Sequence, residues 1–304
     1  MSAKIFIDGE AGTTGLQIRE KFAGVSGLEL LSLPPEARKD AAAKQKLYGE
    51  VDVVILCLPD QAAKEAAHLI DAMGAQAPRV IDASSAHRVA PGWTYGFPEL
   101  VAGQGEAVVK ANKVSNPGCH ATGAIALLRP LTDAGLIPKD APVSIGSVSG
   151  YSGGGKSMIE AYETGKAPAF ELYGLGLEHK HMPEIQLYSG LTARPIFTPS
   201  VGNFRQGMLV SVPLHLDALP GKPKTVDLIA VFKTHYRDQK HFHVAESGDA
   251  PRIEPESLNG TNDIEIHAYP NEARGQALLV AKFDNLGKGA SGAAVQNLML
   301  MLGR

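Results

Sequence analysis

A cysteine lies between a turn signal and a helical pattern. In VSNPGCHATGAIALLRPL, residues 114–131, Asn, Pro and Gly stand directly before Cys119, and the Ala- and Leu-rich stretch after it is typical of a helix. Unpaired N–H groups and the helix dipole favour a thiolate there, and they lower a cysteine pKa from about 8.5 toward roughly 3.5–7.5. The sequence therefore predicts that Cys119 is a nucleophile for carbonyl carbon. The alternative is an inert buried thiol.

Two histidines two residues apart are the candidate proton-transfer partners. His179 and His181 lie in GLEHKHMPEI, and Glu184 follows them. Imidazole titrates near neutral pH, which suits general acid-base catalysis. On an extended segment both rings would face the same side. Solvated surface histidines remain an alternative. We expect no metal site, because a metal site would need three or four ligands at suitable spacing. The sequence offers only the histidines of HFH at 241–243 and no cysteine cluster.

A glycine-rich turn near the start of the chain is the candidate cofactor site. In IDGEAGTTG an apolar strand runs into Gly9, Gly12 and Gly15, and a helical pattern begins at Thr13 and Thr14. Glycines permit a tight turn and a close approach of the backbone to a pyrophosphate, which rests on the helix N-terminus. The strand-turn-helix context favours a dinucleotide over an incidental turn.

The end of the second expected strand indicates which dinucleotide binds. An Asp or Glu there would accept hydrogen bonds from the ribose hydroxyls of NAD. The segment LLSLPPEARKD instead offers Ser32, Arg38 and Lys39. A hydroxyl and cations suit a 2′-phosphate, so the sequence favours NADP. The alternative is that Arg38 and Lys39 only begin a solvated helix.

The stretch GYSGGGKS, residues 150–157, matches the phosphate-loop pattern letter for letter. A phosphate-loop enzyme also needs a parallel sheet and an apolar strand ending in a magnesium-binding Asp after the loop. The region after residue 157 instead predicts antiparallel strands, which argues against ATP hydrolysis. Glycines at Gly153 and Gly154 still permit close contact with a flat ring or a phosphate.

Composition restricts the partner and the compartment. The 304 residues are 44% hydrophobic and 20% charged, with a net charge of −3 and no long basic run. We therefore expect a small-molecule partner, with no nucleic acid and no membrane. A strand pattern begins at the N-terminus and leaves no room for a signal peptide, so we expect a cytoplasmic protein.

Cys57, inside VDVVILCLP, is expected to be a small hydrophobe outside the site.

The alternation of elements predicts an α/β fold. Apolar strands at 4–8, 28–33, 51–58 and 79–84 alternate with helical patterns at 13–24, 40–49 and 61–74, which is typical of a doubly wound, Rossmann-type parallel sheet. After about residue 140, longer strands with period-two alternation predict a second, α+β domain with a mainly antiparallel sheet. We place the dinucleotide-binding domain at 1–116 and a catalytic and oligomerisation domain at 117–285. A closing helix is expected at 286–304.

Several separated blocks together resemble one enzyme family. Combined with IDGEAGTTG, they are similar to the shorter form of N-acetyl-gamma-glutamyl-phosphate reductases, within the aspartate-semialdehyde dehydrogenase-like superfamily. The blocks are YGFPEL (95–100), NPGCHATG (116–123), SGYSGGGK (149–156), EHKHMPEI (178–185) and NLGKGASGAAVQNLMLM (285–301).

The resemblance implies NADPH-dependent reduction of N-acetyl-L-glutamyl 5-phosphate to the 5-semialdehyde in arginine biosynthesis, through a cysteine thioester. It also implies that the C-terminal helix returns to the first domain, and that the enzyme is a homo-oligomer, a dimer or a tetramer. Two alternatives stay open. One is an aspartate-semialdehyde dehydrogenase-like or carrier-linked aminoadipate-semialdehyde reductase, and the other is a non-catalytic NADP-binding sensor.

The resemblance also implies residue roles. Cys119 matches the nucleophile, and within the histidine pair His181 is our choice for the acid-base group. Arg88 is expected near the substrate phosphate, and Asn285 at the nicotinamide. The remaining assignments are Asn116, Ser149 and Glu184 to the substrate and Gly153 and Gly154 to the cofactor.

The chain departs from the longer form at three places. His120 stands where that form has Tyr, and His87 where it often has Phe. The segment NFRQGM, residues 203–208, also differs, which leaves Arg205 and Gln206 without a role.

Overall fold

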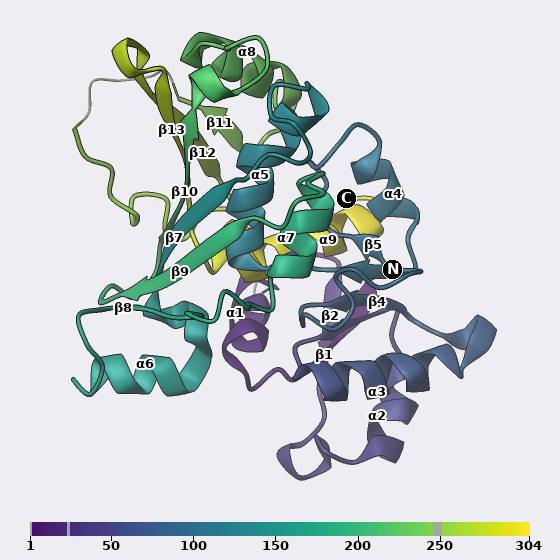
Figure 1. Ribbon diagram of the computed structural model, residues 1–304. Coiled ribbons are helices and arrows are strands. Elements are labelled where there is room, and N and C mark those ends of the chain that lie inside the picture. Colours follow the sequence, from purple (N-terminus) through teal and green to yellow (C-terminus); the bar gives the residue numbers. More distant parts are fainter. Residues whose placement is uncertain (1, 23–24, 246–250) are drawn as a thin grey trace. The chain divides into compact units, whose positions relative to one another are not determined.

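The chain divides into two compact units. The computed structural model describes residues 2–22, 25–245 and 251–304. Unit 1 consists of the chain up to Pro98, Ala102–Pro117 and Ala290–Arg304, and unit 2 consists of Glu99–Val101 and Gly118–Gly289. Each unit has its own sheet (Figure 1).

Unit 1 contains a six-stranded sheet in the order β2-β1-β3-β4-β6-β5, and all of its pairings are parallel. The predicted parallel sheet is therefore confirmed. Its elements are β1 (Ala3–Asp8), α1 (Thr13–Phe22), β2 (Leu28–Leu31), α2 (Ala41–Tyr48), β3 (Val53–Leu56), α3 (Asp60–Asp71), β4 (Arg79–Asp82), β5 (Thr94–Tyr95), α4 (Gln104–Lys110), β6 (Lys113–Ser115) and α9 (Gly292–Met301).

Helices cover both faces of this sheet. On β1, Ile5 and Ile7 pack in one core cluster with residues of α1, α4 and α9, whereas Phe6 packs in another with residues of α2 and α3. Successive strand residues point to opposite faces, so an unbroken apolar strand is buried on both sides. The doubly wound arrangement is confirmed.

Some predicted boundaries differ from the structure. The expected helix at 13–24 is α1, and residues 23–24 lie outside the described part of the chain. Strand β2 ends at Leu31, before Ser32, and β3 ends at Leu56, so Cys57 follows the strand instead of lying inside it. The sequence analysis missed β5 and β6, because two- and three-residue strands carry too little apolar periodicity.

Unit 2 contains a seven-stranded sheet in the order β11-β12-β13-β10-β7-β9-β8. Pairs β7–β9 and β11–β12 are parallel, and the other neighbours are antiparallel, which confirms the mainly antiparallel prediction. Its elements are α5 (Cys119–Asp133), β7 (Ser144–Gly150), α6 (Gly155–Glu163), β8 (Phe170–Leu172), α7 (Met182–Tyr188), β9 (Ile196–Gly202), β10 (Met208–His215), α8 (Thr225–His235), β11 (Phe242–Val244), β12 (Ile264–Asn271) and β13 (Gln276–Phe283).

Helices α5 and α8 cover one face of this sheet (Figure 1). Along β10, Val210 and Val212 are buried on the covered face, whereas Pro213 and His215 are exposed. Almost every residue of α5 from His120 to Thr132 is buried, so this helix is the centre of the unit.

The closing helix begins differently from the prediction. Residues Gly287–Ser291 form a π-helix, and α9 starts only at Gly292. A Cβ at Gly287 would lie 2.0 Å from the Thr261 carbonyl oxygen, so only glycine fits there. In the same turn Lys288, 1% exposed, forms a buried ion pair with Glu99 at 2.7 Å.

Candidate active site

Cys119 is the first residue of α5, at the position where the sequence predicts the helix to begin. Pro117 and Gly118 precede it, and Gly118 caps the helix with extended backbone angles. The Thr122 N–H and hydroxyl both donate to the Gly118 carbonyl, which fixes this turn. The first N–H groups of a helix have no partner inside it. Cys119 therefore lies where backbone donors converge.

Glu184 binds the backbone of the cysteine turn. Its carboxylate oxygen Oε2 accepts the Gly118 N–H at 3.1 Å, and the side chain is 1% exposed. Glu184 lies in the first turn of α7, where the helix dipole favours a negative charge. The structure thus gives Glu184 a role in holding the Cys119 turn, which its assignment to the substrate did not include.

Gly289 lies against Cys119. A Cβ at Gly289 would come within 2.9 Å of the Cys119 Cβ and 3.3 Å of the Phe283 ring. Sequence reasoning missed this residue, although it lies inside the block NLGKGASG. The π-helix therefore brings a glycine of the closing segment against the candidate nucleophile.

His179 and His181 lie together, but not on an extended segment. The chain turns here, because the His181 N–H donates to His179 Nδ1 at 3.2 Å and the Met182 N–H donates to the His179 carbonyl at 2.9 Å. The ring centroids are 4.7 Å apart and nearly perpendicular. The backbone is therefore not extended here, since a turn leads into α7. The prediction had no signal for it beyond Pro183, which suits the first helical turn.

A third imidazole, His120, joins this pair. Its ring centroid lies 5.5 Å from that of His181 and 5.6 Å from that of His179. The charge of Cys119 acts on the Tyr173 hydroxyl, which contacts His120, so the histidine cluster lies in the neighbourhood of the cysteine. Burial, with smaller contributions from His179 and Lys180, lowers the pKa of His120 to about 3. His120 is therefore neutral at neutral pH.

Two hydroxyl groups fix the tautomer of His120. The Ser147 hydroxyl donates to the Leu209 carbonyl, so its oxygen accepts the proton of His120 Nδ1 at 2.7 Å. Nε2 of the neutral ring is then an acceptor, and the Tyr173 hydroxyl donates to it at 2.8 Å. Burial, followed by the charge of Cys119, raises the pKa of Tyr173 well above its ordinary value. Sequence reasoning did not identify Ser147 or Tyr173, although the unusual His120 was a signal.

The glycine-rich loop at 150–154 is anchored by Asn285. The Asn285 amide donates to the Ser152 hydroxyl at 3.0 Å and accepts the Gly207 N–H at 2.8 Å, and the residue is 1% exposed. A Cβ at Gly153 would lie 3.0 Å from the Ser149 hydroxyl oxygen. Ser149, Gly153 and Asn285 therefore lie in one cluster within unit 2.

Arg205 and Gln206 bind acidic side chains of unit 2. Arg205 pairs with Glu163, and both side chains are about half exposed. The Gln206 amide donates to the Asp284 carboxylate. Both contacts are structural.

In unit 1, the glycine-rich turn closes over the start of α1. Gly9 has a φ of +92°, and a Cβ there would lie 2.3 Å from the Cys57 carbonyl oxygen. The Gly12 N–H donates to the Gly9 carbonyl at 2.9 Å, and a Cβ at Gly15 would lie 2.5 Å from that same oxygen. Thr13 and Thr14 form the first turn of α1. The backbone is thus compact enough to let a phosphate approach these helical N–H groups.

Ser32 and Arg38 converge, but on a carboxylate. The Ser32 hydroxyl donates to Glu10 Oε2 at 2.9 Å, and Arg38 Nη2 donates to Glu10 Oε1 at 2.7 Å. Arg19 adds a third contact, to Oε2 at 2.8 Å. Arg38 caps a short 3-10 helix at Pro35–Ala37, while α2 begins only at Ala41, so neither Arg38 nor Lys39 begins a helix. Sequence reasoning missed Glu10 and Arg19.

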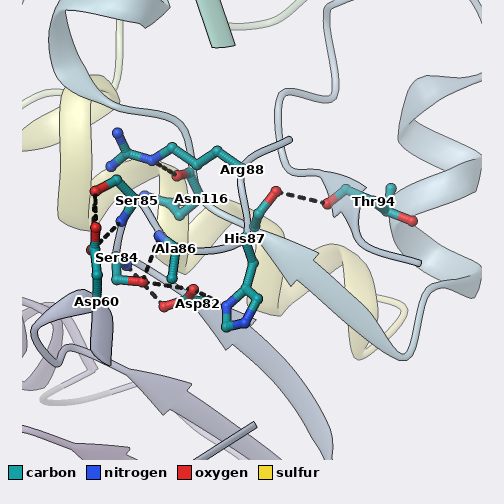
Figure 2. A network of polar contacts seen from close by, with 10 residues as sticks. Asp60, Asp82, Ser84, Ser85, Ala86, His87, Arg88, Thr94 and Asn116 are labelled. Carbon is teal, nitrogen blue, oxygen red and sulfur yellow. Dashed lines mark hydrogen bonds and ion pairs between the residues drawn. The ribbon is translucent and has the colours of Figure 1, made fainter. Parts of the chain in front are cut away.

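Arg88 and Asn116 lie together in unit 1. Arg88 Nε donates to the Asn116 carbonyl at 3.1 Å, and both residues are buried (Figure 2). The Asn116 amide in turn donates to the Ala290 carbonyl at 3.0 Å and accepts from Asn297 at 3.1 Å.

A carboxylate network holds the loop that carries Arg88. Asp82, fully buried at the end of β4, accepts the Ser84 N–H and hydroxyl and pairs with His87 Nδ1 at 2.6 Å (Figure 2). The His87 ring stacks on Trp93 with centroids 4.2 Å apart. This network fixes the backbone directly before Arg88.

Cys57 differs chemically from a nucleophile. Burial, with the charges of Asp82 and Asp8, raises its thiol pKa to about 12. Its backbone also receives the close approach of Gly9.

Residues 2–22, 25–245 and 251–304 lack two features. No group of three or more His, Cys, Asp or Glu is arranged to hold a metal ion. Within the same ranges no helix has the length and apolar character that crossing a membrane requires.

Comparisons with known proteins follow the same division. Residues 15–107 match the family model described as the semialdehyde dehydrogenase NAD binding domain, and residues 119–285 match the semialdehyde dehydrogenase dimerisation domain. Among solved structures, aspartate semialdehyde dehydrogenase II from Vibrio cholerae has a TM-score of 0.75 at 16% identity, covering 100% of this chain and 99% of that one. The enzyme from Candida albicans, solved with NADP, has a TM-score of 0.64 at 14% identity, with 99% of each chain covered. These likenesses establish the fold.

Curated relatives are much more similar in sequence. N-acetyl-gamma-glutamyl-phosphate reductase 2 of Pseudomonas putida is 52% identical over 305 residues, covering 98% of this chain and 96% of that protein. The N-acetyl-gamma-glutamyl-phosphate reductases of a Chelativorans species and of Brucella ovis are 53% and 51% identical, with at least 99% of each chain covered. The cysteine and histidine cluster described above thus lies in a chain that belongs to the N-acetyl-gamma-glutamyl-phosphate reductase family.

Proposed function

We propose that this enzyme reduces N-acetyl-L-glutamyl 5-phosphate with NADPH, giving N-acetyl-L-glutamate 5-semialdehyde and phosphate, as a step of arginine biosynthesis. Family membership at more than 50% identity supports this substrate over that of an aspartate-semialdehyde dehydrogenase. The observation that carries the chemistry is Cys119 at the first turn of α5, followed by His120, whose ring belongs to a cluster of three imidazoles. A non-catalytic sensor would need none of these groups.

The first chemical step belongs to Cys119. Its thiolate attacks the acyl carbon, the C–O bond to the phosphate breaks, and a thioester remains on the enzyme. The Gly118 N–H is engaged by Glu184, so the oxyanion formed in this step would accept hydrogen bonds from N–H groups further along the first turn of α5. Glu184 holds that turn in place.

His181 is the proposed acid-base group. His179 Nδ1 accepts the His181 N–H, which commits that nitrogen to the turn. His120 is held neutral between Ser147 and Tyr173. His181, 3% exposed and next to both rings, therefore remains the best proton donor to the oxygen or sulfur of the thiohemiacetal.

The geometry of unit 1 fits a dinucleotide. Gly9, Gly12 and Gly15 close a turn in which a Cβ at Gly9 or at Gly15 would collide with backbone, and we place the pyrophosphate on the N–H groups at Thr13 and Thr14. Bound NADPH supplies the hydride that reduces the thioester. Its 2′-phosphate would be held by Ser32 and Arg38.

Two further parts of the cofactor and substrate have proposed contacts. In unit 2 we assign Gly153 and Gly154 to the cofactor, with Asn285 at the nicotinamide and holding their loop. Arg88, Asn116 and Ser149 are the proposed substrate contacts. Arg88 would bind the phosphate, because a guanidinium matches its oxygens in a bidentate manner.

The organisation of the molecule follows the same proposal. We assign residues 1–116 with the closing segment 286–304 to dinucleotide binding, and 117–285 to catalysis and oligomerisation. The match of residues 119–285 to a dimerisation domain supports a homo-oligomer, a dimer or a tetramer. We place the enzyme in the cytoplasm, where a reducing environment keeps a reactive thiol free.

The reverse reaction tests this function. Purified enzyme is mixed with NADP, inorganic phosphate and N-acetylglutamate semialdehyde, and the formation of NADPH is followed by its absorbance. We expect turnover that stops when phosphate is omitted, because phosphate must attack the thioester. Turnover with aspartate semialdehyde but not with N-acetylglutamate semialdehyde would contradict the proposal. Turnover that is independent of phosphate would also contradict it.

A further inference from the structure

The proposed 2′-phosphate contacts are already bound to an anion of the protein. Glu10 accepts hydrogen bonds from Ser32 at 2.9 Å, Arg38 at 2.7 Å and Arg19 at 2.8 Å. Its side chain is 5% exposed, whereas those of Arg19 and Arg38 are 51% and 38% exposed. The carboxylate therefore lies inside the cluster, and the two guanidinium groups extend to the solvent.

The backbone holds Glu10 in this place. Gly9, with its positive φ, turns the chain directly before it. On the other side Gly15 packs so closely that a Cβ there would lie 2.8 Å from the Glu10 Cα. Glu10 is therefore fixed between the end of β1 and the first turn of α1, and its side chain meets donors from α1, from the end of β2 and from the segment before α2.

A carboxylate and a phosphate compete for such donors. Both accept short, charge-assisted hydrogen bonds from guanidinium and hydroxyl groups. Two anions in one small cluster repel each other, so a 2′-phosphate must displace Glu10 from at least part of it. The apparent dissociation constant then equals the intrinsic one divided by the fraction of molecules in which the cluster is open.

We infer that Glu10 is a specificity-determining residue that occupies the 2′-phosphate site as an internal competitor, and so weakens NADP binding relative to NAD binding. This inference rests on the proposed role of Ser32 and Arg38. NAD carries a hydroxyl in place of the 2′-phosphate, so it does not need those donors to be released. The opposite role, a scaffold that holds Arg38 ready for the phosphate, predicts the opposite effect of removing the charge.

The test is the substitution Glu10→Gln, which keeps the shape of the side chain and removes its charge. Dissociation constants for NADP and NAD are measured by calorimetry on the full chain. We expect NADP to bind roughly fivefold or more tightly in the variant, with NAD changed by less than about twofold. The fragments 2′-AMP and 5′-AMP should repeat this difference, because only the first carries the 2′-phosphate.

Two variants serve as controls. Glu29→Gln removes an equal charge from an exposed position on β2 and should leave both constants within about twofold. Glu10→Ala provides a second removal of the carboxylate if Glu10→Gln fails to fold, and it should also tighten NADP selectively. Weaker NADP binding, or equal tightening of NADP and NAD, would overturn the inference.

Arg38→Gln separates this inference from the site on which it rests. This substitution should weaken the binding of NADP and leave the dissociation constant of NAD unchanged. If Arg38→Gln weakens the binding of NADP and of NAD equally, the 2′-phosphate is bound elsewhere. The proposed competition at Glu10 is then overturned as well. Since binding requires no turnover, these results do not depend on the outcome of the reductase assay.

Discussion

At the scale of single residues, the imidazole of His120 is held neutral between two hydroxyl groups. Its Nδ1–H donates a hydrogen bond to the Ser147 hydroxyl oxygen, and its Nε2 accepts one from the Tyr173 hydroxyl. A buried histidine with a lowered pKa cannot carry the proton of the reaction at neutral pH. It can instead keep the Tyr173 hydroxyl and the neighbouring histidine rings in fixed places beside Cys119.

The lowered pKa of His120 predicts a dependence of stability on pH. Between its ordinary value of 6.5 and about 3, the unfolded chain binds a proton that the folded chain excludes. The free energy of unfolding therefore falls as the pH falls through this window, by up to about 1.4 kcal/mol per pH unit. His120→Asn should show a shallower decrease, measured by chemical unfolding from pH 7 to pH 4. The exposed His243→Asn is the control, and parallel curves for His120→Asn and wild type would contradict the argument.

The two histidines of the turn should differ in kinetics. In His179→Asn the amide oxygen can replace Nδ1 as acceptor of the His181 N–H, so we expect kcat to fall by less than about tenfold. His181→Asn should lower kcat by roughly 10²–10⁴-fold, the usual contribution of a general acid. Steady-state rates in the reductive direction separate the two. The reverse order of effects would assign the proton transfer to His179.

At the scale of elements, the helices and strands that could be predicted were those with a strong periodic pattern of apolar residues. Long strands such as β10 and β13 and the Ala-rich helices were evident, because burial imposes a period on the sequence. The start of α5 at Cys119 followed from Pro117 and Gly118. The π-helix at 287–291, the turn at His179 and the Glu10 cluster were not predictable. The π-helix and the Glu10 cluster depend on contacts between segments far apart in the chain, such as Thr261 with Gly287 and Glu10 with Arg38. The turn at His179 is held by local hydrogen bonds, and Pro183 was its only signal in the sequence.

Gly289 makes the π-helix testable. An added methyl group would lie 2.9 Å from the Cys119 Cβ, so Gly289→Ala must push the two segments apart. A displacement of even about 1 Å at the nucleophile can cost on the order of 100-fold in kcat. We expect a loss of this size, with NADP binding retained. Gly176→Ala, at a glycine with open space around it, is the matched control. Normal turnover in Gly289→Ala would show that the segment yields without moving Cys119.

At the scale of the whole molecule, one sheet face in the described part of unit 2 carries exposed apolar side chains. Leu278, Ile196 and Pro213 are exposed on strands whose alternate residues are buried under α5 and α8. A cavity of about 890 Å³ adjoins this face, between the ends of β10, β12 and the start of β13. An antiparallel sheet can face water on one side, but apolar side chains there favour a partner surface.

The proposed oligomer should depend on this face. Leu278→Asp places a charge on β13 at the exposed apolar position, and we expect it to shift the enzyme toward monomers. Val226→Asp, at an exposed residue of α8, should leave the oligomer intact. Light scattering after size-exclusion chromatography reports the mass of each. If Leu278→Asp keeps the wild-type mass, the interface lies elsewhere.

The most direct test of the account is a search for the acyl-enzyme. The protein is incubated with N-acetylglutamyl phosphate without NADPH, quenched in acid, digested and analysed by mass spectrometry. We predict one N-acetylglutamyl group on the Cys119 peptide, cleaved by neutral hydroxylamine, and none on the Cys57 peptide, whose thiol stays protonated. Cys119→Ser should show no such adduct. An active enzyme whose Cys119 stays unmodified, or one that carries the group on another residue, would contradict the account.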